Sequence, residues 1–165
     1  RLGLKPISRR VWAACGCRPR ACGRTRYEWA YLYGFVRPRT GQVFGLLRPR
    51  VNADRMGEVL AAFAAHADPR GEKVLVLLVD NAGWHAAKRL AIPPNVRLHF
   101  LPPCTPELQP TEPLWPLVRE ALANRTIGRL ARLRALVRDR LAYLTGHPEV
   151  VRAAVGFRWA VRLER

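Results

Sequence analysis

The sequence has no long hydrophobic segment and few lysines or acidic residues. Its longest aliphatic run covers only residues 74–79, whereas about 20 apolar residues are needed to cross a membrane. No apolar signal core follows the N-terminal Arg-Leu-Gly-Leu, so secretion is not expected. The sequence therefore predicts a cytoplasmic protein that does not contact membranes.

The shortage of lysine and acid leaves arginine as the dominant charge. The chain has 29 basic and 12 acidic residues, a formal charge of +17, and Lys5, Lys73 and Lys88 are its only lysines. Two explanations fit: a polyanionic partner, because guanidinium groups bind phosphate oxygens bidentately, or a coding bias toward arginine. With 165 residues, 49% of them hydrophobic, the chain can bury a core, which excludes a disordered basic tail.

Cysteine is too scarce for a disulfide scaffold at this length. Cys15, Cys17 and Cys22 lie close together, and Cys104 stands apart. The spacing of the first three matches no standard zinc site, and no histidine lies near them to complete four ligands. Free thiols in a reducing cytosol are therefore the favoured interpretation, with a zinc site as the alternative.

Turn residues and hydrophobic periodicity predict the first half of the secondary structure. Residues 27–36 and 42–47 are typical of strands, and the turn at 37–41 between them predicts a hairpin. Asn52 is a suitable N-cap for a helix. Its apolar positions recur at i, i+3, i+4 and i+7, and residues 68–71 end it.

The second half continues as an α/β pattern. Residues 74–79 are apolar at every position, which predicts a strand buried on both faces in the middle of a layered sheet. A short helix over 84–90 and a half-exposed strand over 96–100 follow. Helices are predicted from about residue 117 to the end of the chain. The order of these elements predicts one α/β domain over residues 1–165.

Asp80 directly follows the strand predicted over residues 74–79. A carboxylate at that place is held by a rigid frame. Mg²⁺ favours such oxygen ligands, and a substrate phosphate can fill its remaining positions. The alternative is an ordinary turn-forming residue, because Asp-Asn pairs are common after strands. Taken alone, the position of Asp80 favours this alternative.

Two longer segments are more specific. The first spans residues 79–85 (VDNAGWH) and the second spans residues 101–115 (LPPCTPELQPTEPLW). Together they resemble the DDE transposases of the mariner superfamily, in the bacterial insertion-sequence branch. Those proteins carry Asp-Asn-x-x-x-His, then Leu-Pro-Pro-Tyr-Ser-Pro-Glu-Leu-Asn-Pro-x-Glu-x-x-Trp. Here Cys104 stands in place of the aromatic residue and Gln109 in place of the second asparagine.

The resemblance implies an RNase H-like fold, with a mixed sheet flanked by helices. It also implies DNA cleavage and strand transfer at transposon ends with two Mg²⁺ or Mn²⁺ ions. Carried over by motif, Asp80 and Glu112 are catalytic metal ligands, and Asn81 and His85 bind the substrate. The implied partners are transposon-end and target DNA, a second copy of the chain, and a separately encoded N-terminal DNA-binding part. The implied location is the nucleoid of a bacterial cytoplasm.

In that family the first catalytic Asp ends a central first strand, just before a segment like Arg1 to Leu4. We expect this strand and its Asp to be absent, so the 165-residue chain alone is predicted to be inactive. The alternative function is a non-catalytic, arginine-rich remnant that binds nucleic acid. Another RNase H-like nuclease or integrase would explain the fold but not the Pro-Pro-x-x-Pro-Glu-Leu motif.

Overall fold

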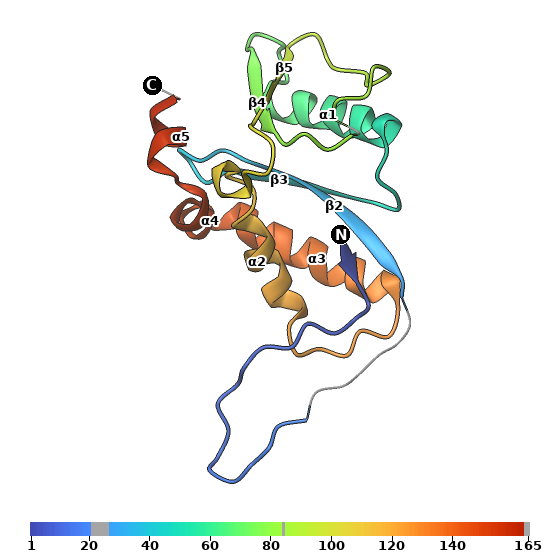
Figure 1. Cartoon of the computed structure of the whole chain (residues 1–165), viewed down its shortest axis with the longest axis vertical. Coiled ribbons are helices and arrows are strands. Elements are labelled where there is room, and N and C mark those ends of the chain that lie inside the picture. The colour runs from blue at the N-terminus through green and yellow to red at the C-terminus, as the bar shows by residue number, and fades with distance from the viewer. Residues whose placement is uncertain (21–26, 84, 164–165) are drawn as a thin grey trace.

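The structure is a computed structural model that describes residues 1–20, 27–83 and 85–163. It is a mixed α/β protein with sheets and helices, as the sequence predicts (Figure 1). In chain order the elements of the described residues are β1 (Leu2–Gly3), β2 (Trp29–Val36), β3 (Val43–Arg48), α1 (Ala53–Ala67), β4 (Leu75–Val79), β5 (Val96–Phe100), the 3₁₀ helix η1 (Pro106–Leu108), α2 (Leu114–Arg119), the 3₁₀ helix η2 (Glu120–Leu122), α3 (Leu130–Gly146), α4 (Pro148–Val155) and α5 (Arg158–Leu163).

The predicted hairpin is confirmed. Tyr31–Val36 of β2 pair antiparallel with Val43–Arg48 of β3, and β1 pairs antiparallel with the start of β2, so the sheet order is β1-β2-β3. The hairpin turn closes on Gly41, whose N–H donates to the carbonyl of Arg37 over 2.8 Å. Gly41 has a φ of 78°, a left-handed conformation that glycine adopts without steric cost.

The helix α1 also begins where the sequence predicts. The side chain of Asn52 accepts a hydrogen bond from the N–H of Arg55 over 2.8 Å, which satisfies one free donor of the first turn. The buried face of α1, with Met56 and Leu60 at its centre, packs against β4 and β5. Together these elements form a second, smaller core.

The prediction that residues 74–79 are buried on both faces is wrong. β4 pairs in parallel with β5 alone, in a sheet of two strands. Leu75 and Leu77 face the core of α1, whereas the alternating residues Val74 and Val76 are 67% and 63% exposed. A run of apolar residues does not specify how many layers cover it, because that depends on the elements that pack on each face.

The helix predicted over 84–90 is also wrong for the residues that can be assessed, since Trp84 lies outside the described part of the chain. Residues 85–90 form turns, held by single bonds such as that from the N–H of Leu90 to the carbonyl of Ala87. Packing decides the conformation of so short a segment, since α2 has only six residues but is helical where it packs on the main core. Instead, Leu90 packs against the core of α1 and β5.

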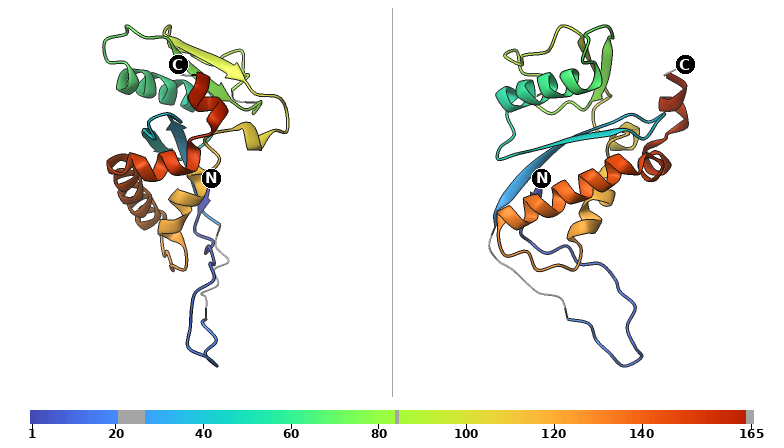
Figure 2. Two further views of the ribbon diagram at one scale, coloured as in Figure 1. Left: turned by 90° about the vertical axis from the view of Figure 1, so that its left-hand side faces the viewer. Right: turned by 180° about the vertical axis from the view of Figure 1, so that it is seen from behind.

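The C-terminal helices begin slightly earlier than predicted, at Leu114 rather than near residue 117. Pro113 is the N-cap of α2, and Pro116 lies in its first turn, where backbone N–H groups have no partner within the helix. The helix therefore tolerates both prolines. α2, α3 and α4 pack against the three-stranded sheet to form the main core, which holds α2 in place (Figures 1 and 2). None of the described helices is long and apolar enough to cross a membrane.

Asp68 joins the end of α1 to the segments before β4 and β5. Its carboxylate accepts hydrogen bonds from the N–H groups of Glu72 and Lys73 and from the side-chain amide of Asn95, at 3.1, 2.9 and 3.1 Å. The residue is only 5% exposed. The bond from the backbone of Lys73 is the largest cause that holds the pKa of this carboxyl below 3.8.

This network predicts an acid-dependent loss of stability. Because the pKa of Asp68 is lower in the folded than in the unfolded chain, its contribution is present above about pH 4 and is lost as the pH falls through the folded value. We expect the urea midpoint of D68N to be lower than that of the wild type at pH 7 and to change less on acidification. D54N, at an exposed acid of α1, is the control. Parallel pH profiles for D68N and the wild type would contradict the prediction.

Candidate active site

Asp80 stands at the carboxyl end of β4, with its side chain 65% exposed. Its Oδ1 accepts a hydrogen bond from the N–H of Ala82 over 3.2 Å and lies 2.9 Å from Nδ1 of His85. Since a carboxylate oxygen can only accept, Nδ1 of His85 carries the proton in this contact. Among described residues, Oδ2 of Asp80 has no hydrogen-bond partner. His85 and the turn thus fix one oxygen and leave the other available.

Asn81 connects the ends of β4 and β5. Its side-chain amide donates to the carbonyl of Leu101 over 2.7 Å, and the N–H of Leu101 donates to the carbonyl of Val79 over 2.9 Å. The two parallel strands therefore end side by side. One motif segment starts at the end of β4, and the other starts directly after β5. The amide nitrogen of Asn81 is committed to this link.

Glu112 is exposed in the turn that leads into α2. The indole N–H of Trp115 donates to its Oε1 over 3.3 Å, and its own backbone N–H donates to the carbonyl of Gln109 over 3.0 Å. The ring of Trp115 lies against Gly34 of β2, so closely that a Cβ at that glycine would approach it to 3.0 Å. Trp115 therefore packs on the core and also orients Glu112.

Gln109 links the two motif segments directly. Its side-chain amide donates to the carbonyl of Leu78 over 3.5 Å, two residues before Asp80. Because the N–H of Glu112 is bonded to the carbonyl of Gln109, this bond ties the turn of Glu112 to the end of β4. Oε1 of Gln109 is buried and has no hydrogen-bond partner among the described residues.

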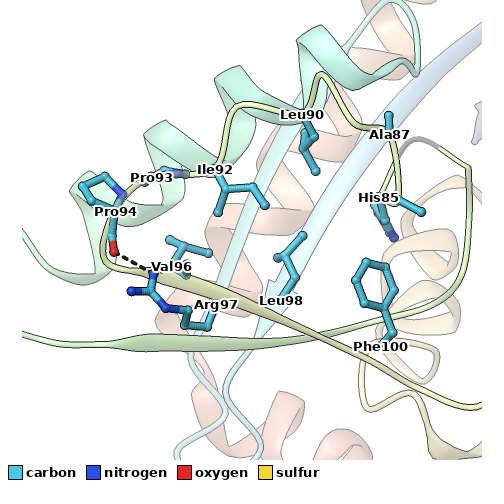
Figure 3. A pocket seen from close by; sticks show the side chains of 11 residues that line it. His85, Ala87, Leu90, Ile92, Pro93, Pro94, Val96, Arg97, Leu98 and Phe100 are labelled. Atoms are coloured by element: carbon cyan, nitrogen blue, oxygen red, sulfur yellow. Dashed lines mark hydrogen bonds between the residues drawn. The ribbon is translucent and has the colours of Figure 1, made fainter.

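An open cavity of about 560 Å³ lies beside His85, between residues 85–94 and β5 (Figure 3). Its lining is mostly apolar, including Leu90 and Phe100, and Arg97 on its rim donates to the carbonyl of Pro94 over 2.7 Å. Neither Asp80 nor Glu112 lines this cavity. It is therefore a neighbour of the candidate carboxylates and not their binding site.

Comparison with known families identifies the chain. Residues 1–134 match the family described as DDE superfamily endonuclease. The chain belongs to this family. A protein of Sinorhizobium fredii (strain NBRC 101917 / NGR234), the uncharacterized protein y4pE/y4sA, is 43% identical over 98 residues, which are 59% of this chain and 71% of that protein. No solved structure matches the chain. At the level of the family, membership indicates a nuclease of the transposase type that acts on DNA and uses divalent metal ions.

The side chains of this DDE endonuclease offer suitable atoms for such ions. Carboxylate oxygens are the ligands that Mg²⁺ prefers, and Asp80 and Glu112 each have one oxygen without a partner in the described structure. However, the described residues contain no group of three or more His, Cys, Asp or Glu arranged to hold a metal. Cys15 and Cys17 are exposed thiols, and Cys22 lies outside the described residues.

Two positioning residues of this DDE endonuclease were not identified from the sequence. In the sequence Gln109 stands out only as a departure from the family motif, and Trp115 only as the last residue of the second motif segment. Their spacing of three residues on each side of Glu112 was the available signal, because residues three apart meet on one face of a helical turn. The bond from Gln109 to Leu78, across 31 residues of sequence, had no local signal.

Proposed function

We propose that the chain is the catalytic part of a mariner-type transposase of the bacterial insertion-sequence branch, which cleaves and joins DNA at transposon ends. Family membership supports the nuclease class, and residues 79–85 and 101–115 support the branch. The observation that carries the proposal is the bond from Gln109 to Leu78, because it brings the turn of Glu112 to the end of the strand that presents Asp80.

In this proposal Asp80 and Glu112 hold Mg²⁺ or Mn²⁺ through their unpartnered oxygens. Bound metal ions activate the attacking water or 3′-hydroxyl and stabilise the leaving oxygen. His85 holds the Asp80 carboxylate in a fixed orientation through Nδ1. Asn81 lies at the same strand end, where its carbonyl oxygen can contact substrate while its amide nitrogen bonds to Leu101.

We further propose that the fold is RNase H-like and needs a central first strand upstream of Arg1. β1 pairs Leu2 with Ala30 and Gly3 with Trp29, so an upstream continuation would run along β2 toward Val36. β3 occupies the other edge of β2, and in the described structure β4 pairs only with β5. A strand between β2 and β4 would join the two sheets, satisfy open backbone edges and place a donor near the buried oxygen of Gln109.

The first catalytic Asp would lie on that strand, which is why we propose that the 165-residue chain alone is inactive. Dimerisation and a separately encoded DNA-binding part belong to the same proposal, as does a place at the bacterial nucleoid. The charge of +17 favours a second candidate, an arginine-rich module that binds nucleic acid without cleaving it.

Metal titration tests the site without requiring activity. We expect D80N and E112Q each to weaken Mn²⁺ binding by at least about tenfold, because each removes a charged ligand. Binding can be followed through the electron paramagnetic resonance of free Mn²⁺. E107Q, which removes an exposed carboxylate from the same Pro-rich segment, is the matched control. If all three variants bind Mn²⁺ like the wild type, the site is wrong and the non-catalytic candidate is favoured.

A further inference from the structure

The two C-terminal helices form a basic pocket that lies outside the family match to residues 1–134. The pocket has a volume of about 300 Å³ and is lined by Arg152, Gly156, Arg158, Val161 and Arg162. All three arginines are exposed. The match to the DDE family therefore assigns no role to this part of the chain.

The turn between α4 and α5 brings these arginines together. Arg152 is in the last turn of α4, and the N–H of Gly156 donates to its carbonyl over 2.9 Å. Arg158 and Arg162 lie four residues apart on α5, so they share one face of that helix. Val151 and Val155 of α4 are fully buried in the main core. The pocket is therefore attached to the main core.

The tip of the β2–β3 hairpin packs against the helix that carries Arg152. Gly41 at this tip packs closely against Pro148 and Arg152, and Gly156 lies near the carbonyl of Pro38. The tip carries two further exposed arginines, Arg37 and Arg39. Figures 1 and 2 show the hairpin tip beside α4 and α5. The hairpin tip therefore packs beside the two helices whose arginines line the pocket.

The three arginines of the pocket differ from other arginines of the described surface in their ion pairing. Of the acidic residues that the structure describes, none forms an ion pair with Arg152, Arg158 or Arg162. By contrast, Arg55 pairs with Glu58 and Arg89 pairs with Asp54 elsewhere on the surface. Clustered like charges repel one another, and an anionic ligand that accepts guanidinium hydrogen bonds relieves this repulsion.

We propose that the pocket lined by Arg152, Arg158 and Arg162 binds the phosphate backbone of duplex DNA. Its donors are guanidinium groups, which match phosphate oxygens bidentately, and such contacts position a duplex without reading its sequence. α4 and α5, whose residues line the pocket, lie on the same side of the molecule as the chain segment that leads into α2 (Figure 1). The idea that this pocket guides DNA toward Asp80 and Glu112 rests on the proposed function. The idea that the pocket binds phosphate does not rest on it.

A salt titration of DNA binding tests the pocket. The probe is a short fluorescein-labelled duplex of arbitrary sequence, in EDTA, with the full 165-residue chain. We expect R152Q/R158Q/R162Q to bind about tenfold more weakly at about 0.1 M salt. Loss of three phosphate contacts should also reduce the slope of log affinity against log salt by about 2.7.

The control R50Q/R55Q/R89Q removes the same formal charge around the N-terminal end of α1, away from α5 (Figure 1). Its slope should stay close to that of the wild type. An equal loss of slope in both variants would show that only net charge matters and would overturn the proposal, as would wild-type chain that does not bind the duplex at low salt. The titration is made in EDTA and measures DNA binding without metal, so failure of the metal site leaves this test unaffected.

A second measurement needs no variant and covers the case in which the triple substitution unfolds the chain. Phenylglyoxal modifies accessible arginines, and mass spectrometry locates the products. We expect the duplex to protect Arg152, Arg158 and Arg162 strongly and Arg50 weakly. Equal modification of the three pocket arginines with and without DNA would refute the pocket as a phosphate site.

Discussion

The 165-residue chain is expected to leave supercoiled plasmid uncut in millimolar Mg²⁺ or Mn²⁺, at the rate of a buffer control. The proposed chemistry needs carboxylates from separate elements to converge on the metal ions. The described structure provides Asp80 after β4 and Glu112 before α2, and the proposed third carboxylate lies upstream of Arg1. With an incomplete ligand set, metal can bind weakly without being placed for an in-line attack on phosphorus.

The complementary experiment adds the upstream strand that the proposal calls for. If the in-frame sequence that precedes the codon for Arg1 encodes a strand ending in Asp, the extended chain should nick the plasmid at least about a hundredfold faster than the 165-residue chain. That factor corresponds to the several kcal/mol that a correctly held metal ion contributes to the transition state. D80N in the extended chain should abolish the gain.

Metal-dependent nicking by the 165-residue chain itself, lost in D80A, would contradict this expectation. It would mean that another acid replaces the missing one. Glu28 would be the first to examine, because it directly precedes β2 and its carbonyl accepts a hydrogen bond from the N–H of Leu4 over 3.1 Å. The variant E28Q would then remove the residual nicking.

Substitution of Gly41 by alanine is expected to lower the free energy of unfolding by about 3 kcal/mol or more. Two costs add at this position. Its φ of 78° is unfavourable for any residue with a Cβ. The new Cβ would also overlap the carbonyl oxygen of Pro148 and crowd the backbone of Arg152. Urea unfolding followed by circular dichroism measures the change.

Gly71 supplies the matched control. Its φ of 69° is similar, but nothing lies within 4 Å of a Cβ placed there. G71A should therefore cost only the conformational term, about 1–2 kcal/mol. Equal destabilisation by G41A and G71A would show that the hairpin tip does not pack tightly on α4. A larger loss for G41A would support the packing that also builds the arginine pocket.

The elements that the sequence predicted well are those fixed by local interactions. The β2–β3 hairpin follows from a turn with a glycine where φ is positive, and α1 follows from the cap at Asn52. Both depend on residues a few positions apart. The turns at 85–90 and the exposure of Val76 were not predictable in this way, because they depend on which distant elements supply or withhold a packing surface.

The sequence by itself determined which side chains are candidates for chemistry, since the resemblance of its two motif segments to a known family points to Asp80, Asn81, His85 and Glu112. Only the tertiary structure decided how the two motif segments meet. The hydrogen bonds from Asn81 to Leu101 and from Gln109 to Leu78 join residues 20 and 31 positions apart. The packing of the hairpin tip on α4 likewise joins distant parts of the chain. Such contacts form only when packing brings remote segments together, so no local pattern encodes them.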